Sequence, residues 1–255
     1  MTVQQWIEYP TEPKELILAW QAAPCESVAD RLRWAVGRLT PEGNRTTFAY
    51  LTGDEFVKLN LGRTETQIRS LGYAGYPAFD PKRQSDDGFH DRVLDAFLRR
   101  LPPPSRRDYG EYLAYFHVRR DARLSPLSLL AITEARLPSD GFSLIDPLNP
   151  VTSRVDVVIE VAGFRHFQDR HGPLREGDAL HLEPEPSNVT DPNAIRFMMA
   201  GQGIGYVNRL QAPTVGVWLN RRAILGRIAR IHDRSPSPRA YAFLQIRPTE
   251  ERIAA

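Results

Sequence analysis

The chain has 255 residues but little cysteine and no long apolar run, and each absence excludes a class of protein. Its single cysteine, Cys25, allows no disulfide within the chain and no zinc site made of cysteines, which fits a reducing compartment. No stretch approaches the roughly 20 apolar residues that span a bilayer. The first residues also lack the basic and apolar regions of a signal peptide. We therefore expect a cytoplasmic protein with no membrane partner.

Lysine is also scarce, because Lys14, Lys58 and Lys82 are the only three. The other cationic side chains are arginines, which bind phosphate through two parallel hydrogen bonds and stack on bases. A GC-rich coding sequence produces the same arginine excess, and we favour that explanation for the composition as a whole. The net charge of +2 indicates a mildly basic protein, far from the charge of a histone tail.

The short motifs of common catalytic sites are missing. The sequence contains no G-x-S-x-G, no H-E-x-x-H and no P-loop. The glycines of GQGIGY fall between two predicted strands, which is typical of a hairpin turn. His166, Asp169 and His171 give a weak hint of a metal site, and an exposed polar loop explains them better. We expect no metal, no cofactor and no catalysis.

The first half of the chain predicts strands followed by helices. Runs at 15–20, 34–40 and 45–52 have the apolar alternation of strands, with a turn at 41–43. Helical spacing follows, and three helices are expected at 89–101, at 105–118 with Ser105 as the cap, and at 125–137. The last begins with Ser125 and Pro126, a favourable N-cap and first-turn pair.

The second half predicts a mostly β domain. Strand patterns occur near 153–164, 177–186, 193–200, 203–208, 223–231 and 239–248, with a helix near 212–220. Residues 138–150 are rich in Pro, Asp, Ser and Gly and are interpreted as the approach to a domain boundary. We therefore predict a two-domain α+β protein, with an α+β domain at 1–148 and a small β-barrel with one helix at 152–250.

Three segments of the second half occur in a characteristic order. They are VAGFRHF at 161–167, LREGDALHLEPEPSNVTDPNAI at 174–195 and GIGYVNRL at 203–210. Over about residues 155–245 this order resembles the HIRAN family. That family is a small β-barrel module found in helicase-like transcription factor and in stand-alone bacterial proteins. The resemblance implies an OB- or SH3-like barrel that holds the 3′ end of single-stranded DNA.

The resemblance also implies which residues meet the nucleic acid. Asn188 and Asp191 match the turn that contacts the terminal 3′-hydroxyl, and Thr190 stands where the family often has a stacking aromatic. This departure weakens the expected stacking, which contributes about 1–3 kcal/mol per base. The remaining matched positions offer cations for phosphate or rings for bases, and they are Arg165, His166, Phe167, Tyr206 and Arg209.

A purely structural interpretation of NVTDPNAIRF stands beside this one. Asp191 and Asn193 are typical of Asx turns before a strand, and we assign Asn193 to that role. Ala194 and Ile195 are expected in the core. Asn188 and Asp191 are suited to both the turn and the binding role, and the family resemblance alone puts binding ahead. Tyr206 also fits a half-buried barrel position.

The first half more faintly resembles the region that precedes the HIRAN module in bacterial stand-alone proteins, which is similar to the N-terminal subdomain of HipA-type kinases. The segments that carry this are ELILAWQ, WAVGRL, LGYAGYPAF and VLDAFLRRLPPPSRRDYGEYLAYF. We expect no phosphoryl transfer. The alternative function is a protein–protein adaptor or regulatory subunit of a HipA-like or defence system, in which the first half forms the interface. An acidic strip with Glu183 and Glu185 at the edge of a pocket would favour that alternative, because it would repel phosphate.

Overall fold

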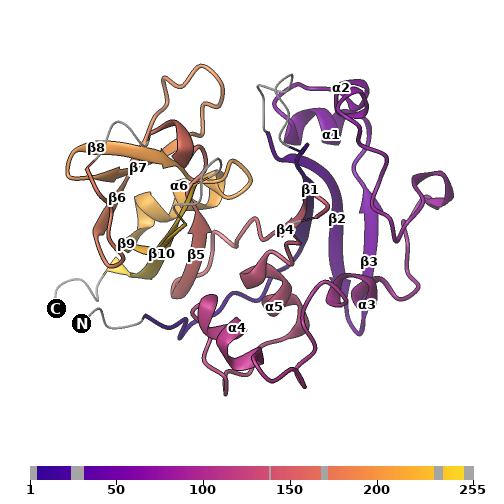
Figure 1. Ribbon diagram of the computed structural model, residues 1–255. Coiled ribbons are helices and arrows are strands. Elements are labelled where there is room, and N and C mark those ends of the chain that lie inside the picture. The colour runs from indigo at the N-terminus through magenta and orange to yellow at the C-terminus, as the bar shows by residue number, and fades with distance from the viewer. Residues whose placement is uncertain (1–4, 24–31, 138, 168–171, 233–237, 250–255) are drawn as a thin grey trace. The chain divides into compact units, whose positions relative to one another are not determined.

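The computed structural model describes residues 5–23, 32–137, 139–167, 172–232 and 238–249 (Figure 1). Contacts divide the chain into two compact units. The C-terminal unit comprises residues 1–11, 110–123 and 148–255, and the N-terminal unit comprises 12–109 and 124–147. This division differs from the predicted domains, because two stretches of the first half group with the C-terminal unit. Within the described ranges, no helix has both the length and the apolarity needed to cross a membrane.

The N-terminal unit contains a four-stranded antiparallel sheet in the order β3-β2-β1-β4. Its strands are β1 (Leu16–Trp20), β2 (Trp34–Glu42), β3 (Arg45–Tyr50) and β4 (Phe142–Ile145). The first three confirm the predicted strands. The turn predicted at 41–43 is displaced toward the C-terminus, because β2 continues through Pro41 to Glu42. Of the predicted residues only Gly43, with a φ of 60°, lies in the turn. Pairing with β1 ends at Leu39, so the missing N–H of Pro41 costs no ladder bond on that side.

Strand β4 corrects the interpretation of residues 138–150. This segment was predicted as the approach to a boundary, yet all four residues of β4 are buried and pair with β1. The run of β4 is only four residues long and lies between turn residues, so it gives no strand pattern of its own. The strand therefore depends on pairing with a partner more than 100 residues away in the sequence, at Ile17 to Trp20.

The helices of the first half are shorter than predicted. They are α1 (Gly53–Leu59), α2 (Glu65–Ser70), the 3-10 turn η1 (Pro81–Arg83), α3 (Val93–Leu98), α4 (Tyr109–Tyr115) and α5 (Pro126–Thr133). The predicted start of α5 is confirmed, since the Ser125 hydroxyl accepts from the Ser128 N–H at 3.0 Å. Helix α3 does not begin at Phe89, because Phe89 forms a β-bridge with Phe48. Helix α4 begins four residues after Ser105, so Ser105 is not its cap.

The C-terminal unit contains a six-stranded antiparallel sheet in the order β5-β10-β9-β6-β7-β8. Its strands are β5 (Val155–Glu160), β6 (Ala179–Pro184), β7 (Ile195–Met199), β8 (Gln202–Tyr206), β9 (Arg222–His232) and β10 (Arg239–Pro248). All six were predicted. The predicted barrel is not closed, because β5 and β8 share no ladder. A single bridge between Ala162 and Tyr206, with hydrogen bonds of 2.8 and 2.9 Å, links the two edges.

Helix α6 (Ala212–Arg221) packs its apolar face against β7 and β9 and fills the centre of this unit. Trp218 of α6 is 1% exposed, and it shares the core with Phe197 of β7 and Leu244 of β10. Amphipathic spacing within the helix explains this face, because Val215 and Trp218 are three residues apart. Ala194 and Ile195 are buried, as predicted.

Candidate nucleic-acid interface

The turn between β6 and β7 is built by two of the predicted residues. The Asn188 carbonyl oxygen Oδ1 accepts from the N–H groups of Thr190 at 3.0 Å and Asp191 at 3.1 Å. Asp191 Oδ1 accepts from the N–H of Asn193 at 2.9 Å. Asn188 and Asp191 therefore shape the turn, as the structural interpretation expected. Asn193 gives its backbone N–H to this turn, and its residue is exposed.

Glu185 connects this turn to β7. Its Oε2 accepts from the side-chain amide of Asn188 at 2.9 Å, and its Oε1 forms an ion pair with the guanidinium of Arg196. The Glu185 side chain is 24% exposed and that of Arg196 is 33% exposed, so the pair is only partly screened by water. The carboxylate thus holds the start of the turn and the arginine at once.

Arg196 lies in a small pocket of about 250 Å³ with Phe167, Gln202, Gly203 and Tyr206. The Arg196 Nη2 is 3.4 Å from the Tyr206 hydroxyl oxygen. The rings of Phe167 and Tyr206 meet edge to face, with centroids 5.8 Å apart. A Cβ at position 203 would lie 2.7 Å from the Cδ of Arg196, so Gly203 leaves the room that the arginine occupies.

Arg165 and His166 directly precede Phe167, a residue of this pocket, along the chain. Both belong to the 3-10 turn η2 (Phe164–His166). Phe164 is buried in the core and fixes the turn. The Arg165 Nε–H points at the His166 Nε2 over 3.0 Å, which makes that nitrogen an acceptor. Partial burial, and then the charge of Arg165, lower the pKa of His166 from 6.5. His166 is therefore neutral at physiological pH, and a positive charge here comes from Arg165.

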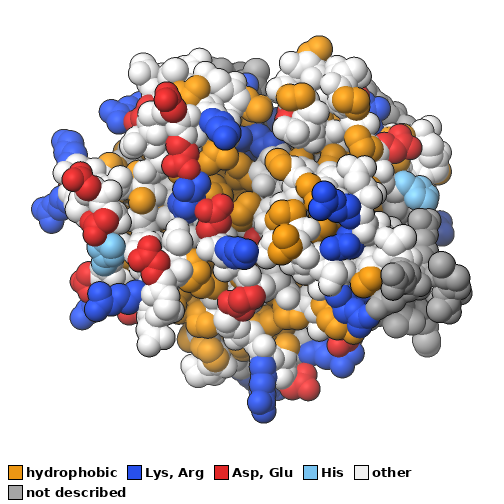
Figure 2. All heavy atoms as spheres, turned by 180° about the vertical axis from the view of Figure 1, so that it is seen from behind, with side chains coloured by type: hydrophobic (Ala, Val, Ile, Leu, Met, Phe, Trp, Pro, Cys, Tyr) orange, Lys and Arg blue, Asp and Glu red, His pale blue; other side chains and the backbone are white. Residues whose placement is uncertain are grey.

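The structure thus brings together Asn188, Asp191, Phe167 and Tyr206 through a continuous series of contacts. Thr190 is exposed on the turn, and Arg209 is half-buried between β8 and α6. Asp169 and His171, the weak metal hint, lie outside the described residues. On the face drawn in Figure 2, basic and acidic side chains are interspersed, in keeping with the net charge of +2.

Two central residues of this site were missed by sequence reasoning. Arg196 occupies an alternating strand position in NAIRF, which is typical of a solvent-facing side chain. Glu185 was seen only as part of an acidic strip, because its ion pair spans 11 residues. The small residue Gly203 was the available signal. Its φ is not positive, so close packing explains it better than turn geometry.

Comparison with known proteins identifies one region of the chain. The HIRAN domain family model matches residues 155–220, a range that contains every residue predicted for the interface. This match confirms the predicted resemblance over those residues. No curated protein matches the chain. Among solved structures, the crystal structure of the HIRAN domain of human HLTF matches with 19% identity, 39% of this chain and 81% of that chain covered, and a TM-score of 0.31. The resemblance of the first half to HipA proteins stays a prediction.

Proposed function

We propose that the C-terminal unit binds the 3′ end of single-stranded nucleic acid, preferably DNA, and catalyses no reaction. The match to the HIRAN family supports nucleic-acid binding as the class of function. One observation carries the proposal. The contacts from Asn188 through Glu185 and Arg196 to Tyr206 join a polar turn to an aromatic pocket. End recognition and base stacking need such a combination within one site.

Asp191 is the residue that would recognise the end. One carboxylate oxygen accepts from the N–H of Asn193, which fixes the side chain and leaves the other oxygen for a hydroxyl donor. A terminal 3′-hydroxyl donates such a hydrogen bond. A terminal 3′-phosphate would instead bring negative charge against the carboxylate, so the site should prefer the hydroxyl.

Phe167 and Tyr206 would contact the last bases. Their edge-to-face packing holds both rings in place before a ligand arrives, and both are only partly buried. Stacking on one of them is worth about 1–3 kcal/mol per base, and Thr190 adds no ring. Arg165 and Arg209 would neutralise phosphates, so log K should fall with log salt by about 0.7 for each phosphate contacted.

Fluorescence anisotropy with two short DNA oligonucleotides, one ending in a free 3′-hydroxyl and one in a 3′-phosphate, tests the proposal. The informative variant is Asp191→Asn, which keeps an oxygen that accepts from Asn193 but removes the charge and replaces the second oxygen by an NH2 group. Asp54→Asn, at an exposed position in the first turn of α1 in the N-terminal unit, is the matched control. We expect the wild type and the control to prefer the hydroxyl, and Asp191→Asn to lose that preference.

Equal and weak binding of both oligonucleotides, unchanged by Asp191→Asn, would mean that the turn is only a turn. That outcome would favour the adaptor alternative, in which the first half binds a protein partner. One observation speaks for this alternative, since Glu185 places negative charge at the edge of the pocket, where it neutralises Arg196. Affinity purification with the whole chain would then be the next experiment.

A further inference from the structure

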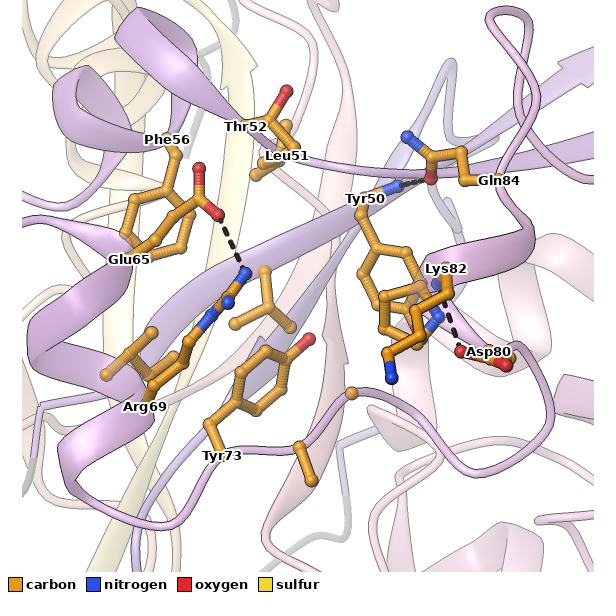
Figure 3. A pocket seen from close by; sticks show the side chains of 15 residues that line it. Tyr50, Leu51, Thr52, Phe56, Glu65, Arg69, Tyr73, Asp80, Lys82 and Gln84 are labelled. Atoms are coloured by element: carbon orange, nitrogen blue, oxygen red, sulfur yellow. Dashed lines mark hydrogen bonds and ion pairs between the residues drawn. The ribbon is translucent and has the colours of Figure 1, made fainter.

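The N-terminal unit has a cavity that the proposed nucleic-acid function does not use. It has a volume of about 460 Å³ and lies between the β2–β3 sheet, helices α1 and α2, and the segment 73–84 (Figure 3). Small-molecule sites commonly have volumes of about 300–1,000 Å³. The cavity is therefore large enough for a compound of one or two fused rings.

The floor of this cavity is apolar. Val36 and Leu51 from the sheet, and Phe56 and Ile68 from α1 and α2, are each at most 5% exposed. The ring of Tyr50 forms one side, where its hydroxyl accepts from the Tyr76 N–H at 2.8 Å and donates to the Phe79 carbonyl at 2.5 Å. An apolar, planar ligand that packed on these surfaces would be stabilised by the burial of apolar area.

Tyr73 forms the opposite side, and its hydroxyl is the exceptional group. The oxygen is buried, and within the described residues no hydrogen-bond partner reaches it. The ring is held by Trp20, with centroids 5.3 Å apart, and by Phe142 at 6.3 Å. Figure 3 shows the hydroxyl directed into the space between Arg69 and Lys82. Burial strongly raises the pKa of Tyr73, so this group remains a hydrogen-bond donor.

A buried hydroxyl without a partner destabilises the folded protein, and this cost is recovered when a ligand atom supplies the missing hydrogen bond. The same cavity contains Tyr50, whose hydroxyl has two partners. The difference between the two tyrosines therefore marks the position at which a ligand acceptor is missing.

The charges at the rim decide the kind of acceptor. The Glu65 carboxylate already accepts from the Gly53 N–H at 3.2 Å and pairs with Arg69 at 3.4 Å. Asp80 accepts from the backbone N–H of Lys82 at 3.0 Å. The ammonium group of Lys82, by contrast, has no ion pair or hydrogen bond among the described residues. Both carboxylates are thus engaged, and the available charge is positive.

Gly75 makes the cavity a preformed one. Its φ of 102° brings the backbone so close to η1 that a Cβ would lie 2.6 Å from the Cγ of Pro81. This contact fixes the loop that carries Tyr73 against the turn that carries Lys82. A ligand would therefore find the backbone around both groups in place, and a local side-chain shift would expose the buried Tyr73 hydroxyl to it.

We propose that this cavity binds small aromatic carboxylates. The ring packs on the apolar floor between Tyr50 and Tyr73, and the acceptor oxygens of the ligand meet the Tyr73 hydroxyl and the Lys82 ammonium. The chemistry of the cavity selects against cationic ligands, because its carboxylates are already occupied, and against purely apolar ones, because the Tyr73 hydroxyl would stay unpaired.

Isothermal titration calorimetry of the full chain with naphthoate, and with the neutral isostere naphthamide, tests this site. We expect one saturable site for naphthoate and weaker binding of the amide. Lys82→Gln should weaken naphthoate binding about tenfold, since a charge-assisted hydrogen bond is lost. Lys14→Gln, at an exposed position of the same unit away from the cavity, is the matched control and should bind like the wild type.

Tyr73→Phe provides an independent check, because it keeps the ring and removes only the hydroxyl. We expect several-fold weaker naphthoate binding together with an unchanged or raised melting temperature, since a buried unpaired group is removed. A merely structural role of Tyr73 would not give this combination. Absence of saturable naphthoate binding, equal binding of the amide, or wild-type affinity in both Lys82→Gln and Tyr73→Phe would overturn the proposal.

Discussion

The carboxylate of Glu185 accepts a hydrogen bond from the side-chain amide of Asn188 over 2.9 Å. The two residues stand just after β6, and the same carboxylate pairs with Arg196 of β7. A single anion therefore organises the turn and reduces the positive charge of the pocket next to it. This double role makes Glu185 a sensitive position for testing the proposed nucleic-acid site.

Glu185→Gln should strengthen the binding of single-stranded DNA. The glutamine oxygen still accepts from Asn188, while Arg196 loses its counter-charge and becomes available to a phosphate. Anisotropy titrations at several salt concentrations should show tighter binding at low salt and a slope of log K against log salt that is steeper by about 0.7. An affinity and a slope equal to those of the wild type would place phosphate away from Arg196.

Arg230→Lys should destabilise the C-terminal unit by about 1–2 kcal/mol, because lysine cannot replace a planar group stacked between rings. The Arg230 guanidinium lies 4.1 Å from the Tyr115 ring centroid and 3.9 Å from that of Tyr241, and the residue is 8% exposed. Arg227→Lys, at an exposed position on the same strand, is the control and should change stability by less than about 0.5 kcal/mol. Urea unfolding measures both, and equal effects would contradict the stacking explanation.

Stability should fall below pH 6.5 because of His117. Burial, and then the nearby charge of Arg230, lower the pKa of this buried histidine from 6.5, although its Nδ1–H donates to the Gln5 carbonyl at 2.9 Å. The unfolded chain therefore takes up the proton first. The stability that neutral His117 contributes to the folded state is fully present above pH 6.5. It is lost, by up to about 1.4 kcal/mol per pH unit, as the pH falls toward the folded-state pKa.

Urea unfolding of the wild type and of His117→Gln between pH 8 and pH 5 measures this contribution as the difference between the two curves. The other histidines titrate in both proteins, so their effects cancel. The wild type should lose more stability than the variant on acidification. Parallel pH profiles would show that His117 titrates normally in the folded protein.

Asp140→Asn should destabilise the N-terminal unit by about 2–3 kcal/mol. Its carboxylate pairs with both terminal nitrogens of Arg100, at 2.6 and 3.0 Å, and the Arg100 side chain is only 6% exposed. Loss of the anion leaves a buried cation without its counter-charge. Glu8→Gln removes one partner of the exposed pair between Glu8 and Arg119 and should cost less than about 1 kcal/mol. Chemical denaturation measures the free energy of unfolding of both variants. Similar losses would contradict the role of Asp140 as counter-charge to a buried cation.

The sequence predicts the strands of both sheets except β4, because their patterns are local. Thr46, Phe48 and Tyr50 alternate along β3 and all three are buried, and Thr47 between them is buried as well. Non-local pairing determines what was missed. Strand β4 exists because β1 pairs with it, and α3 starts late because Phe89 joins Phe48. Neither partner can be found from the neighbouring residues.

The candidate interface divides in the same way. The order of short segments pointed to Asn188, Asp191, Phe167 and Tyr206, and the turn geometry of the first two follows from their residue types. Arg196 could not be identified, because a charged residue on an alternating strand normally faces solvent. Only the fold shows that Gly203 of β8, which pairs with Met198, leaves space for the Arg196 side chain.

The N-terminal segment of the C-terminal unit is attached by a buried carboxylate. Asp156 of β5 is 1% exposed and accepts from the N–H groups of Glu8 at 2.9 Å and Tyr9 at 3.1 Å, while Arg247 of β10 donates to it at 2.6 Å. Three parts of the chain thus meet at one side chain, and two of them are separated by 148 residues of sequence.

This arrangement has a consequence for synthesis on the ribosome. The sheet of the N-terminal unit has all its strands once β4 has emerged. The sheet of the C-terminal unit cannot hold β5 until β10 emerges, because β10 lies between β5 and β9. Domains generally fold as they are made. The segment with Glu8 and Tyr9 is synthesised first, yet its partner Asp156 has no counter-charge until Arg247 has been synthesised. A nascent chain would therefore carry one finished sheet while the other remains open to chaperones.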